Sequence, residues 1–156
     1  MNKSLTLQIR RTNSGDSDFL RLVSLLDQDL AIRDGDQHAF FSQFNKLDKT
    51  LNAVVVYTEN VAIGCGAIRP YSENTVEVKR MFVMPTQRGK GIGIMLLTEL
   101  ESWAVESGYK RCILETGKKQ PEAIRLYQKA DYLSIPNYGQ YEQIENSVCF
   151  EKMLKG

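Results

Sequence analysis

The feature that most constrains this chain is a glycine-rich stretch, RGKGIG at residues 88–93, between a strand-like run and a helical one. Glycine is a poor helix former, yet the following IMLLTELESWA (94–104) has a helical pattern, so the glycines belong to a turn whose backbone approaches something closely. A glycine-rich turn that opens a helix directs several backbone N–H groups and the positive helix end at one point. The stretch therefore predicts a site for a phosphate or pyrophosphate.

The spacing of these glycines excludes two common nucleotide motifs. A P-loop needs Ser or Thr after its Gly-Lys pair, but Gly91 follows Lys90. A dinucleotide-binding fingerprint needs its third glycine where Ile94 stands. An ordinary tight turn is the structural alternative, although a turn needs only one or two glycines.

The first third of the chain predicts a strand followed by helices. LTLQIRR (5–11) alternates as a strand does, and the next segment has a helical apolar stripe with Ser17 or Asp18 as its cap. A weaker second helix is expected over DGDQHAFFSQFNK (34–46). The stripe of the first helix consists of Phe19, Leu22, Val23, Leu26 and Leu30.

The rest of the chain alternates strands and helices. The expected strands are 51–60 and 61–72, joined by a hairpin at Glu59-Asn60, then 75–84, 109–116 and 146–154. Helices are expected at 93–107, ended by Gly108, and at 120–130. Gly64 and Gly66 inside a strand indicate a bulge or close packing. The pattern predicts an α/β (α+β) fold with a mixed sheet, in the order β-α-α-β-β-β-α-β-α-β-β, as a single domain over residues 1–156.

Composition narrows the range of partners. The chain has 20 basic and 19 acidic residues, so its net charge of +1 produces no overall electrostatic field that would attract nucleic acid. The cysteines, Cys65, Cys112 and Cys149, stand in apolar runs typical of buried reduced thiols. No segment has the pattern of a signal peptide or a membrane span, so we expect a cytoplasmic protein with no membrane partner. His38 is the single histidine, expected on a helix surface, and a His-rich metal site is excluded.

Three motifs together resemble the GNAT superfamily of acyl-CoA-dependent N-acyltransferases. RGKGIG (88–93) fits the family's R/Q-x-x-G-x-G/A signature, and VEVKRMFVMP (76–85) looks like its fourth strand. EAIRLYQKADY (122–132) resembles its A-x-x-L-Y-x-x-x-G-[FY] helix, with Ala130-Asp131 where a glycine is usual. The expected element order is also that of the family, so the resemblance covers essentially the whole chain.

The resemblance implies acetyl-CoA as co-substrate, with no metal, bound in a V-shaped opening between the fourth and fifth strands. Backbone groups of Met81, Phe82 and Val83 are expected to bind the pantetheine arm as an added strand would. Backbone amides of the glycine turn are expected to bind the pyrophosphate. That turn consists of Arg88, Gly89, Lys90, Gly91, Ile92 and Gly93.

Acetyl transfer to an amine needs a base for the ammonium proton and an acid for the departing thiolate. Glu77, four residues before Met81 and expected on the same strand face, matches a position where some family members place a catalytic glutamate; a salt-bridged strand glutamate is an equal alternative. Glu115 is the second candidate, as base or acceptor ligand. Tyr127 matches the family's general acid, although it could also pack as a half-buried helix tyrosine.

The acceptor site is less defined. The resemblance places it among the first two helices and the last loop, where Arg33 could hold a carboxylate, Asp34 or Asp36 an ammonium, and Tyr138 and Tyr141 could form walls. All of these also suit ordinary loop residues. We therefore expect an N-acetyltransferase acting on a primary amine of a small molecule, or of a protein or peptide. The alternative is a non-catalytic acyl-CoA-binding sensor, and exposed strand edges are compatible with a homodimer.

Overall fold

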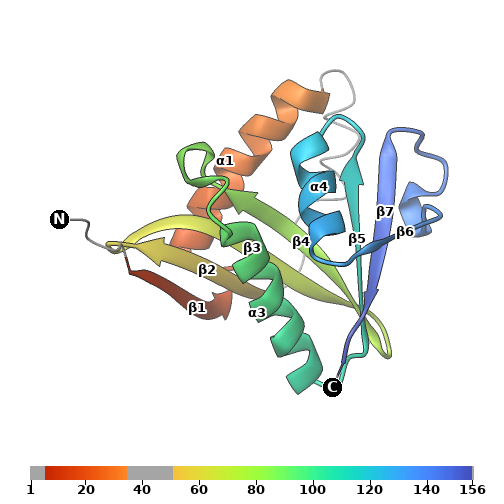
Figure 1. Ribbon diagram of the computed structural model, residues 1–156, viewed down its shortest axis with the longest axis horizontal. Coiled ribbons are helices and arrows are strands. Elements are labelled where there is room, and N and C mark those ends of the chain that lie inside the picture. The colour runs from red at the N-terminus through yellow and green to blue at the C-terminus, as the bar shows by residue number, and fades with distance from the viewer. Residues whose placement is uncertain (1–5, 35–50, 156) are drawn as a thin grey trace.

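The fold is a seven-stranded mixed sheet with helices on both faces, as seen in a computed structural model that describes residues 6–34 and 51–155 (Figure 1). The strands lie in the order β1-β2-β3-β4-β5-β7-β6. The expected second helix (34–46) lies almost wholly outside the described residues, as do His38 and Asp36. The elements are β1 (Leu7–Asn13), α1 (Ser17–Asp34), β2 (Asn52–Thr58), β3 (Val61–Ser72), β4 (Thr75–Val83), a 3-10 turn (Pro85–Gln87), α3 (Ile92–Glu106), β5 (Arg111–Gly117), α4 (Pro121–Lys129), β6 (Leu133–Ile135), a second 3-10 turn (Gly139–Tyr141) and β7 (Ser147–Met153).

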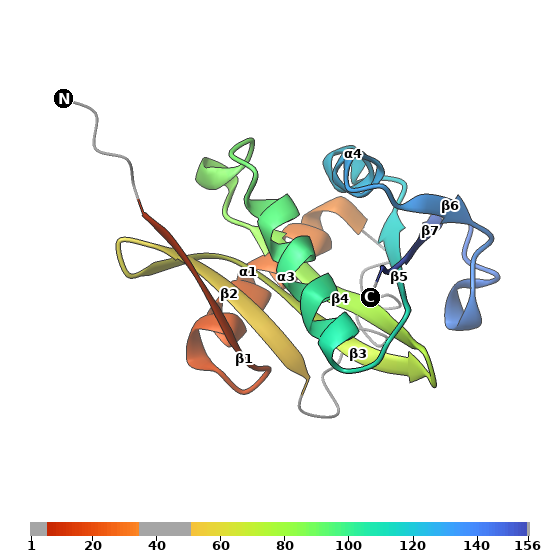
Figure 2. The ribbon, with the colours of Figure 1, turned by 60° about the horizontal axis from the view of Figure 1, so that its bottom comes forward.

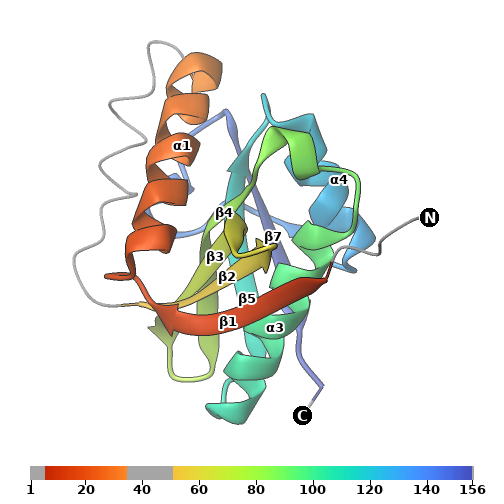
Figure 3. The same ribbon diagram turned by 90° about the vertical axis from the view of Figure 1, so that its left-hand side faces the viewer.

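Two apolar cores sandwich the sheet. Helix α1 covers one face, and α3 and α4 lie on the other, as Figure 3 shows from the side. Consecutive residues of β2 alternate between the two cores, since Val54 and Val56 pack with α3 whereas Ala53 and Val55 pack with α1. The expected α1 stripe is confirmed, with Phe19 and Leu22 fully buried.

Local signals explain most element boundaries. Glu59 and Asn60 both have positive φ, 48° and 67°, as the tight hairpin between β2 and β3 requires. Helix α3 ends in a Schellman motif, in which Gly108 has φ 93° and the Tyr109 amide bonds the Ala104 carbonyl at 2.9 Å.

The expected cap of α1 was wrong by one or two positions. The carboxylate of Asp16 accepts hydrogen bonds from the amides of Asp18 (2.9 Å) and Phe19 (3.0 Å). Asp16 therefore caps the helix in place of Ser17 or Asp18. A cap must precede the first helical residue, and the run GDSD offers three polar candidates between which periodicity does not decide.

Among the described strands, β4 and β5 form the one parallel pair, and they then separate. Their pairing is confined to Thr75–Glu77 of β4 against Arg111–Ile113 of β5. Beyond these positions the two strands diverge, and α4 lies over the opening (Figure 1). The remaining residues of β4 consequently present backbone groups toward the gap, where no strand of residues 6–34 and 51–155 pairs with them.

A β-bulge in β4 changes which face its side chains occupy. Cys65 of β3 pairs with Phe82 and Ala67 pairs with Lys79, so Arg80 and Met81 together oppose Gly66. Arg80 takes up the irregularity with a positive φ of 62°. Met81 consequently packs with Val76 and Val78 in the α3 core. The expectation that Glu77 and Met81 share a strand face is wrong, because simple alternation does not hold across a bulge.

Glycines in β3 allow α3 to lie close to the sheet. A Cβ at Gly66 would come within 2.5 Å of the Met81 sulfur, and one at Gly64 within 3.0 Å of an Ile92 methyl group. Of the two alternatives expected for this segment, close packing is confirmed, and the bulge at this point lies in β4 opposite Gly66. The contact between Gly64 and Ile92 places the start of α3, which follows the glycine turn, against β3.

Candidate active site

The glycine turn forms one wall of a cavity of about 290 Å³ beside the diverging end of β4. Met81, Phe82 and Val83 of β4 line it from one side, and α4 lines it from the other. Figure 2 shows the turn leading into α3 on the same side of the molecule as α4. Of the residues predicted to hold acetyl-CoA, those that line this cavity are Met81, Phe82, Val83, Arg88, Gly89, Gly91, Ile92 and Gly93.

The three glycines of the turn have two different roles. Gly89 and Gly91 have φ values of 79° and 82°, and a Cβ at either would contact nothing within 4 Å. They are needed for backbone conformation and leave open space in front of the turn. Gly93 lies in the first turn of α3, where a Cβ would come within 2.9 Å of Leu126. The third glycine therefore allows α3 and α4 to approach each other.

Backbone donors gather at the start of α3. The first N–H groups of a helix have no acceptor within the helix, and its positive end favours an anion. The first turn of α3 contains no acidic residue that would compete for them. Among the described residues, no backbone acceptor is found for the amides of Gly89, Lys90 or Gly91. This donor set fits the pyrophosphate of acetyl-CoA.

The two basic residues of the turn differ in position. The Arg88 guanidinium donates to the Val83 carbonyl at 2.9 Å and lies 5.7 Å from the centre of the Phe82 ring, which ties the turn to the end of β4. Lys90 bonds the Gln87 side chain at 3.2 Å and is absent from the cavity lining. Arg88 therefore shapes the site, whereas Lys90 adds charge at its rim.

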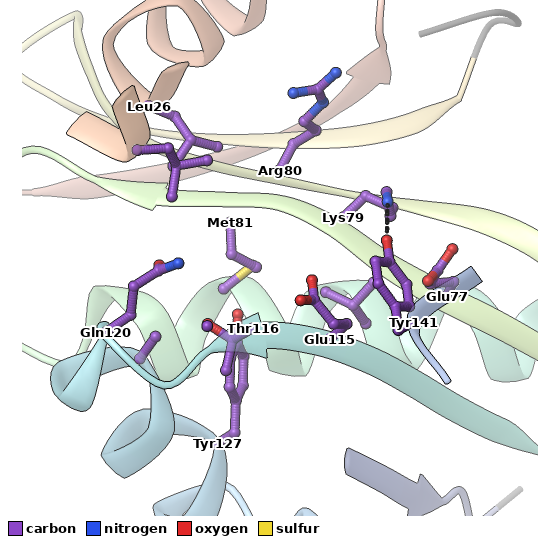
Figure 4. A pocket seen from close by; sticks show the side chains of 14 residues that line it. Leu26, Glu77, Lys79, Arg80, Met81, Glu115, Thr116, Gln120, Tyr127 and Tyr141 are labelled. Carbon is purple, nitrogen blue, oxygen red and sulfur yellow. Dashed lines mark hydrogen bonds between the residues drawn. The ribbon is translucent and has the colours of Figure 1, made fainter. Parts of the chain in front are cut away.

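A second cavity, of about 100 Å³, continues from the first between the separated strands (Figure 4). Its walls come from β4, β5, α1, α4 and the turn that carries Tyr141. The two cavities share five lining residues, namely Leu26, Met81, Gln120, Ala123 and Tyr127. The space beside the glycine turn thus adjoins a smaller, charged compartment.

Tyr127 stands at the junction of the two cavities. Helix α4 begins with Pro121 in its first turn and places Tyr127 with only 6% of its surface exposed. Burial raises the pKa of the Tyr127 phenol, and the negative charge of Glu115 raises it further. The phenol therefore stays protonated and is suited to donate a hydrogen bond to a developing thiolate.

Glu77 lies at the end of the small cavity, fully buried and held by two partners. Arg69 of β3 donates to one carboxylate oxygen at 2.7 Å, and the Tyr138 hydroxyl donates to the other at 2.5 Å. Burial, followed by the charge of Glu77, raises the pKa of Tyr138. Tyr138 thereby connects the loop between β6 and β7 to β4. Of the two tyrosines expected to form walls of the acceptor site, Tyr141 lines the cavity and Tyr138 does not.

Glu115 enters the same cavity from β5. It is half-buried, and the Ser147 hydroxyl donates to its carboxylate at 2.6 Å. Lys79 from β4 bonds the Tyr141 hydroxyl at 3.3 Å, the contact drawn in Figure 4. Burial lowers the pKa of Lys79, while the charges of Glu77 and then Glu115 act in the opposite direction.

Several lining residues were not identified from the sequence. Lys79 and Arg80 both line the small cavity, and Arg69 holds Glu77. The motif VEVKR carries three charged residues, of which only Glu77 was predicted to act in the site. A signal was present in the uncommon pair of adjacent cations inside a strand. Arg33 and Asp34 belong to the last turn of α1, and their side chains lie outside the described part of the structure.

Two further observations bear on the type of site. Within residues 6–34 and 51–155 there is no grouping of three or more His, Cys, Asp or Glu side chains that could hold a metal ion. All three cysteines are buried and free. In the same described ranges, no helix has both the length and the apolar character needed to cross a membrane.

Comparison with known proteins assigns this chain to a family. An IAA acetyltransferase of Azospirillum brasilense is 39% identical over 102 residues, which are 65% of this chain and 67% of that protein. Three further curated N-acetyltransferases are matched over 48%, 50% and 39% of their own lengths. A Klebsiella pneumoniae structure described as an acyl-CoA N-acyltransferase is 30% identical, with a TM-score of 0.81, over 96% of this chain and 98% of that one.

More distant structures share the fold. A GNAT acetyltransferase of Elizabethkingia anophelis with acetyl-CoA bound has a TM-score of 0.68 at 18% identity, over 95% of this chain and 98% of that one. Residues 20–132 match the sequence profile of the Acetyltransferase (GNAT) family. The fold, the family and acetyl-CoA as co-substrate, all predicted from the sequence, are confirmed. The chain belongs to the GNAT family and is an acetyl-CoA-dependent N-acetyltransferase.

Proposed function

We propose that the protein transfers the acetyl group of acetyl-CoA to a primary amine of a small molecule, by direct attack in a ternary complex. The observation that carries this proposal is the continuity of the two cavities at Tyr127. One cavity offers backbone donors and an open strand edge, and the other offers carboxylates and a phenol. A terminal amine of a peptide would use the same chemistry, but the small compartment of about 100 Å³ favours a small acceptor.

The residues that line the larger cavity suit two parts of acetyl-CoA. With its pyrophosphate at the amides that open α3, the pantetheine arm would follow the unpaired side of β4 at Met81–Val83. Extended ligands bind exposed sheet edges in this way, because main-chain groups on both sides are satisfied. The thioester would then lie beside Tyr127, facing the small cavity.

The acceptor nitrogen loses two protons, the first to a base or solvent as the ammonium becomes the free amine and the second on attack, and the sulfur of CoA gains one. The amine nitrogen forms a bond to the carbonyl carbon as the carbon–sulfur bond breaks, and the proton of the amine passes to a carboxylate, directly or through water. The departing thiolate receives a proton from Tyr127 along the hydrogen bond between them. Solvent then returns a proton to Tyr127. The raised pKa of Tyr127 favours stabilisation by hydrogen bonding over early proton release.

Of the two carboxylates, we favour Glu115 as the base. Both oxygens of Glu77 already accept strong hydrogen bonds, from a guanidinium and a phenol, and these bonds hold the carboxylate in place. Glu115 is less buried, lines the small cavity and influences Tyr127 electrostatically. Glu77 then acts as a positioning residue, although its direct role as base stays a prediction.

The first experiment measures thermal unfolding with and without acetyl-CoA, CoA, ATP and NAD. A ligand that binds only the folded state raises the midpoint, so we expect shifts with the two CoA compounds alone. A screen of primary amines, followed by release of the CoA thiol, then tests turnover. Binding of acetyl-CoA without acetylation of any amine would instead support the acyl-CoA sensor. The absence of a shift with CoA would contradict the proposed site.

A further inference from the structure

We infer that the acceptor is a small amino acid, recognised as a zwitterion by the charged walls of the second cavity. This inference rests on the proposed function and specifies its substrate class. It starts from the lining of that cavity, where four ionisable residues other than tyrosine meet, two carboxylates and two cations. They are Glu77, Glu115, Lys79 and Arg80.

The two cations come from adjacent positions of the bulged strand. Arg80 has a positive φ of 62°, which is uncommon outside glycine, and only 6% of its side-chain surface is exposed. Residues held in such conformations cluster at functional sites. Because a regular strand directs neighbouring side chains to opposite faces, the bulge is what brings Arg80 and Lys79 to the same cavity.

The guanidinium of Arg80 is incompletely matched within the protein. Its ion pair with Asp27 of α1 is 3.4 Å long, and the Asp27 side chain is 50% exposed. In the part of the chain that the structure describes, the buried Nε of Arg80 has no hydrogen-bond partner. A buried cation with such weak compensation is costly unless an anion accompanies it. A carboxylate on the acceptor would provide that anion.

The neighbouring Lys79 strengthens this conclusion. Burial disfavours its charged form, and a bound carboxylate would favour it again, as any nearby anion does. Two adjacent cations also oppose an acceptor with a second ammonium group, such as a polyamine. The carboxylates of the cavity lie near the reacting amine instead, and Glu115 appears between Tyr127 and the Lys79–Tyr141 pair in Figure 4.

The size of the cavity limits how far apart the two charges of the acceptor can be. Its volume of about 100 Å³ is below the roughly 150 Å³ of an engineered cavity that admits benzene. Only the amine and a few atoms next to it fit inside. A carboxylate that reaches Arg80 and Lys79 must therefore be close to the amine, as in an α- or β-amino acid.

The test compares small amino acids with their amides. Glycine, alanine, serine and threonine are each assayed beside the corresponding α-carboxamide, with acetyl-CoA saturating. The amide has the less basic amine and hence more free base at neutral pH, so a preference for the acid cannot arise from amine reactivity. We expect kcat/KM to favour the acids by about tenfold to hundredfold, as for a charge-assisted hydrogen bond.

Two variants examine the cations separately. Lys79→Met should lower the acid-to-amide ratio of kcat/KM about tenfold. Arg80→Asn should have the same effect, since Asn tolerates the left-handed conformation that the bulge requires. Lys152→Met is the matched control, because Lys152 is a partly buried lysine that bonds Glu101 outside the cavity. Thermal unfolding of each variant shows whether it is folded.

Calorimetric titration of the acids and amides into the enzyme–CoA complex separates this inference from the proposed function. Binding of the acids that Lys79→Met weakens supports the zwitterion site, even if turnover is not found. Equal binding or turnover of acids and amides, equal losses for both in the variants, or no binding of either overturns it. Acetylation of other amines would then leave the proposed function intact.

Discussion

The two cavities that meet at Tyr127 are built by different means. In the larger one, the groups proposed to hold acetyl-CoA belong mainly to the backbone, namely the amides that open α3, two glycines of positive φ and the side of β4 away from β3. The smaller one is formed by side chains from five elements distant in sequence, with charges that partly neutralise one another. In the arrangement we propose, a co-substrate shared by the family would be bound by groups common to all residues, and a particular acceptor by groups specific to this chain.

The difference teaches where specificity can change without loss of the fold. The direction of backbone donors depends on chain conformation, which a few glycines set. The other side chains of the turn can therefore differ without moving these donors. Side-chain charges in the small cavity depend on each residue separately, and each is held by its own partner. Substitutions should accordingly act on acetyl-CoA binding in one cavity and on the chemical step or acceptor in the other.

The largest expected effect comes from removing the base in the smaller cavity. Glu115→Gln should lower kcat by about a hundredfold to ten-thousandfold, the range for loss of a general base, and leave acetyl-CoA affinity unchanged. The loss should be greatest below the pKa of the amine, where the acceptor arrives protonated. Stopped-flow detection of the CoA thiol across a pH series measures it.

The matched control for this substitution is Glu151→Gln on the neighbouring strand β7. Glu151 pairs with Arg111 at 2.9 Å and is absent from both cavities, so kcat should hardly change. A normal rate in Glu115→Gln would remove Glu115 from the mechanism and return Glu77 to the position of first candidate.

At the junction, Tyr127→Phe should lower kcat about tenfold or more with little change in acetyl-CoA affinity, as for a group that acts in the transition state. The control is Tyr132→Phe, which removes another buried phenol of the same core, one that bonds Glu101 at 2.9 Å. This control should lose stability and keep its rate. If both variants keep the wild-type kcat, Tyr127 is a packing residue.

In the larger cavity, Gly91→Ala should weaken acetyl-CoA binding about tenfold, because a Cβ at φ 82° costs about 1–2 kcal/mol in left-handed backbone. Gly108→Ala is a close control, since Gly108 also has positive φ and open space but lies at the opposite end of α3. Both variants should lose similar stability in thermal unfolding. Isothermal titration would contradict the assignment if both bound acetyl-CoA equally well.

The smallest expected effect on rate is that of Glu77→Gln. Loss of the charged bond to Arg69 should lower the free energy of unfolding by about 1–3 kcal/mol. The cost stays below that of a fully buried pair because the Arg69 side chain is 37% exposed and can be hydrated. As a positioning change it should reduce kcat by the same factor at every pH. A loss concentrated at low pH would instead make Glu77 the base.

Much of the fold could be predicted because local signals agree with it. The turn at Glu59-Asn60, the glycine after α3 and the apolar stripe of α1 each determine their own element. The prediction failed where a neighbouring strand decides the conformation. The bulge at Arg80 follows from the register of β4 against β3, and it reversed the predicted relation between Glu77 and Met81.

The sequence by itself determined the family, its co-substrate and the order of the described elements, because glycine positions and hydrophobic periodicity act over a few residues. Only the tertiary structure decided the partners of Glu77, the meeting of Glu115 with Lys79 and Arg80, and the role of Gly93 against Leu126. These contacts join residues far apart in the chain. Their geometry depends on how β4 and β5 separate, which is a property of the assembled sheet.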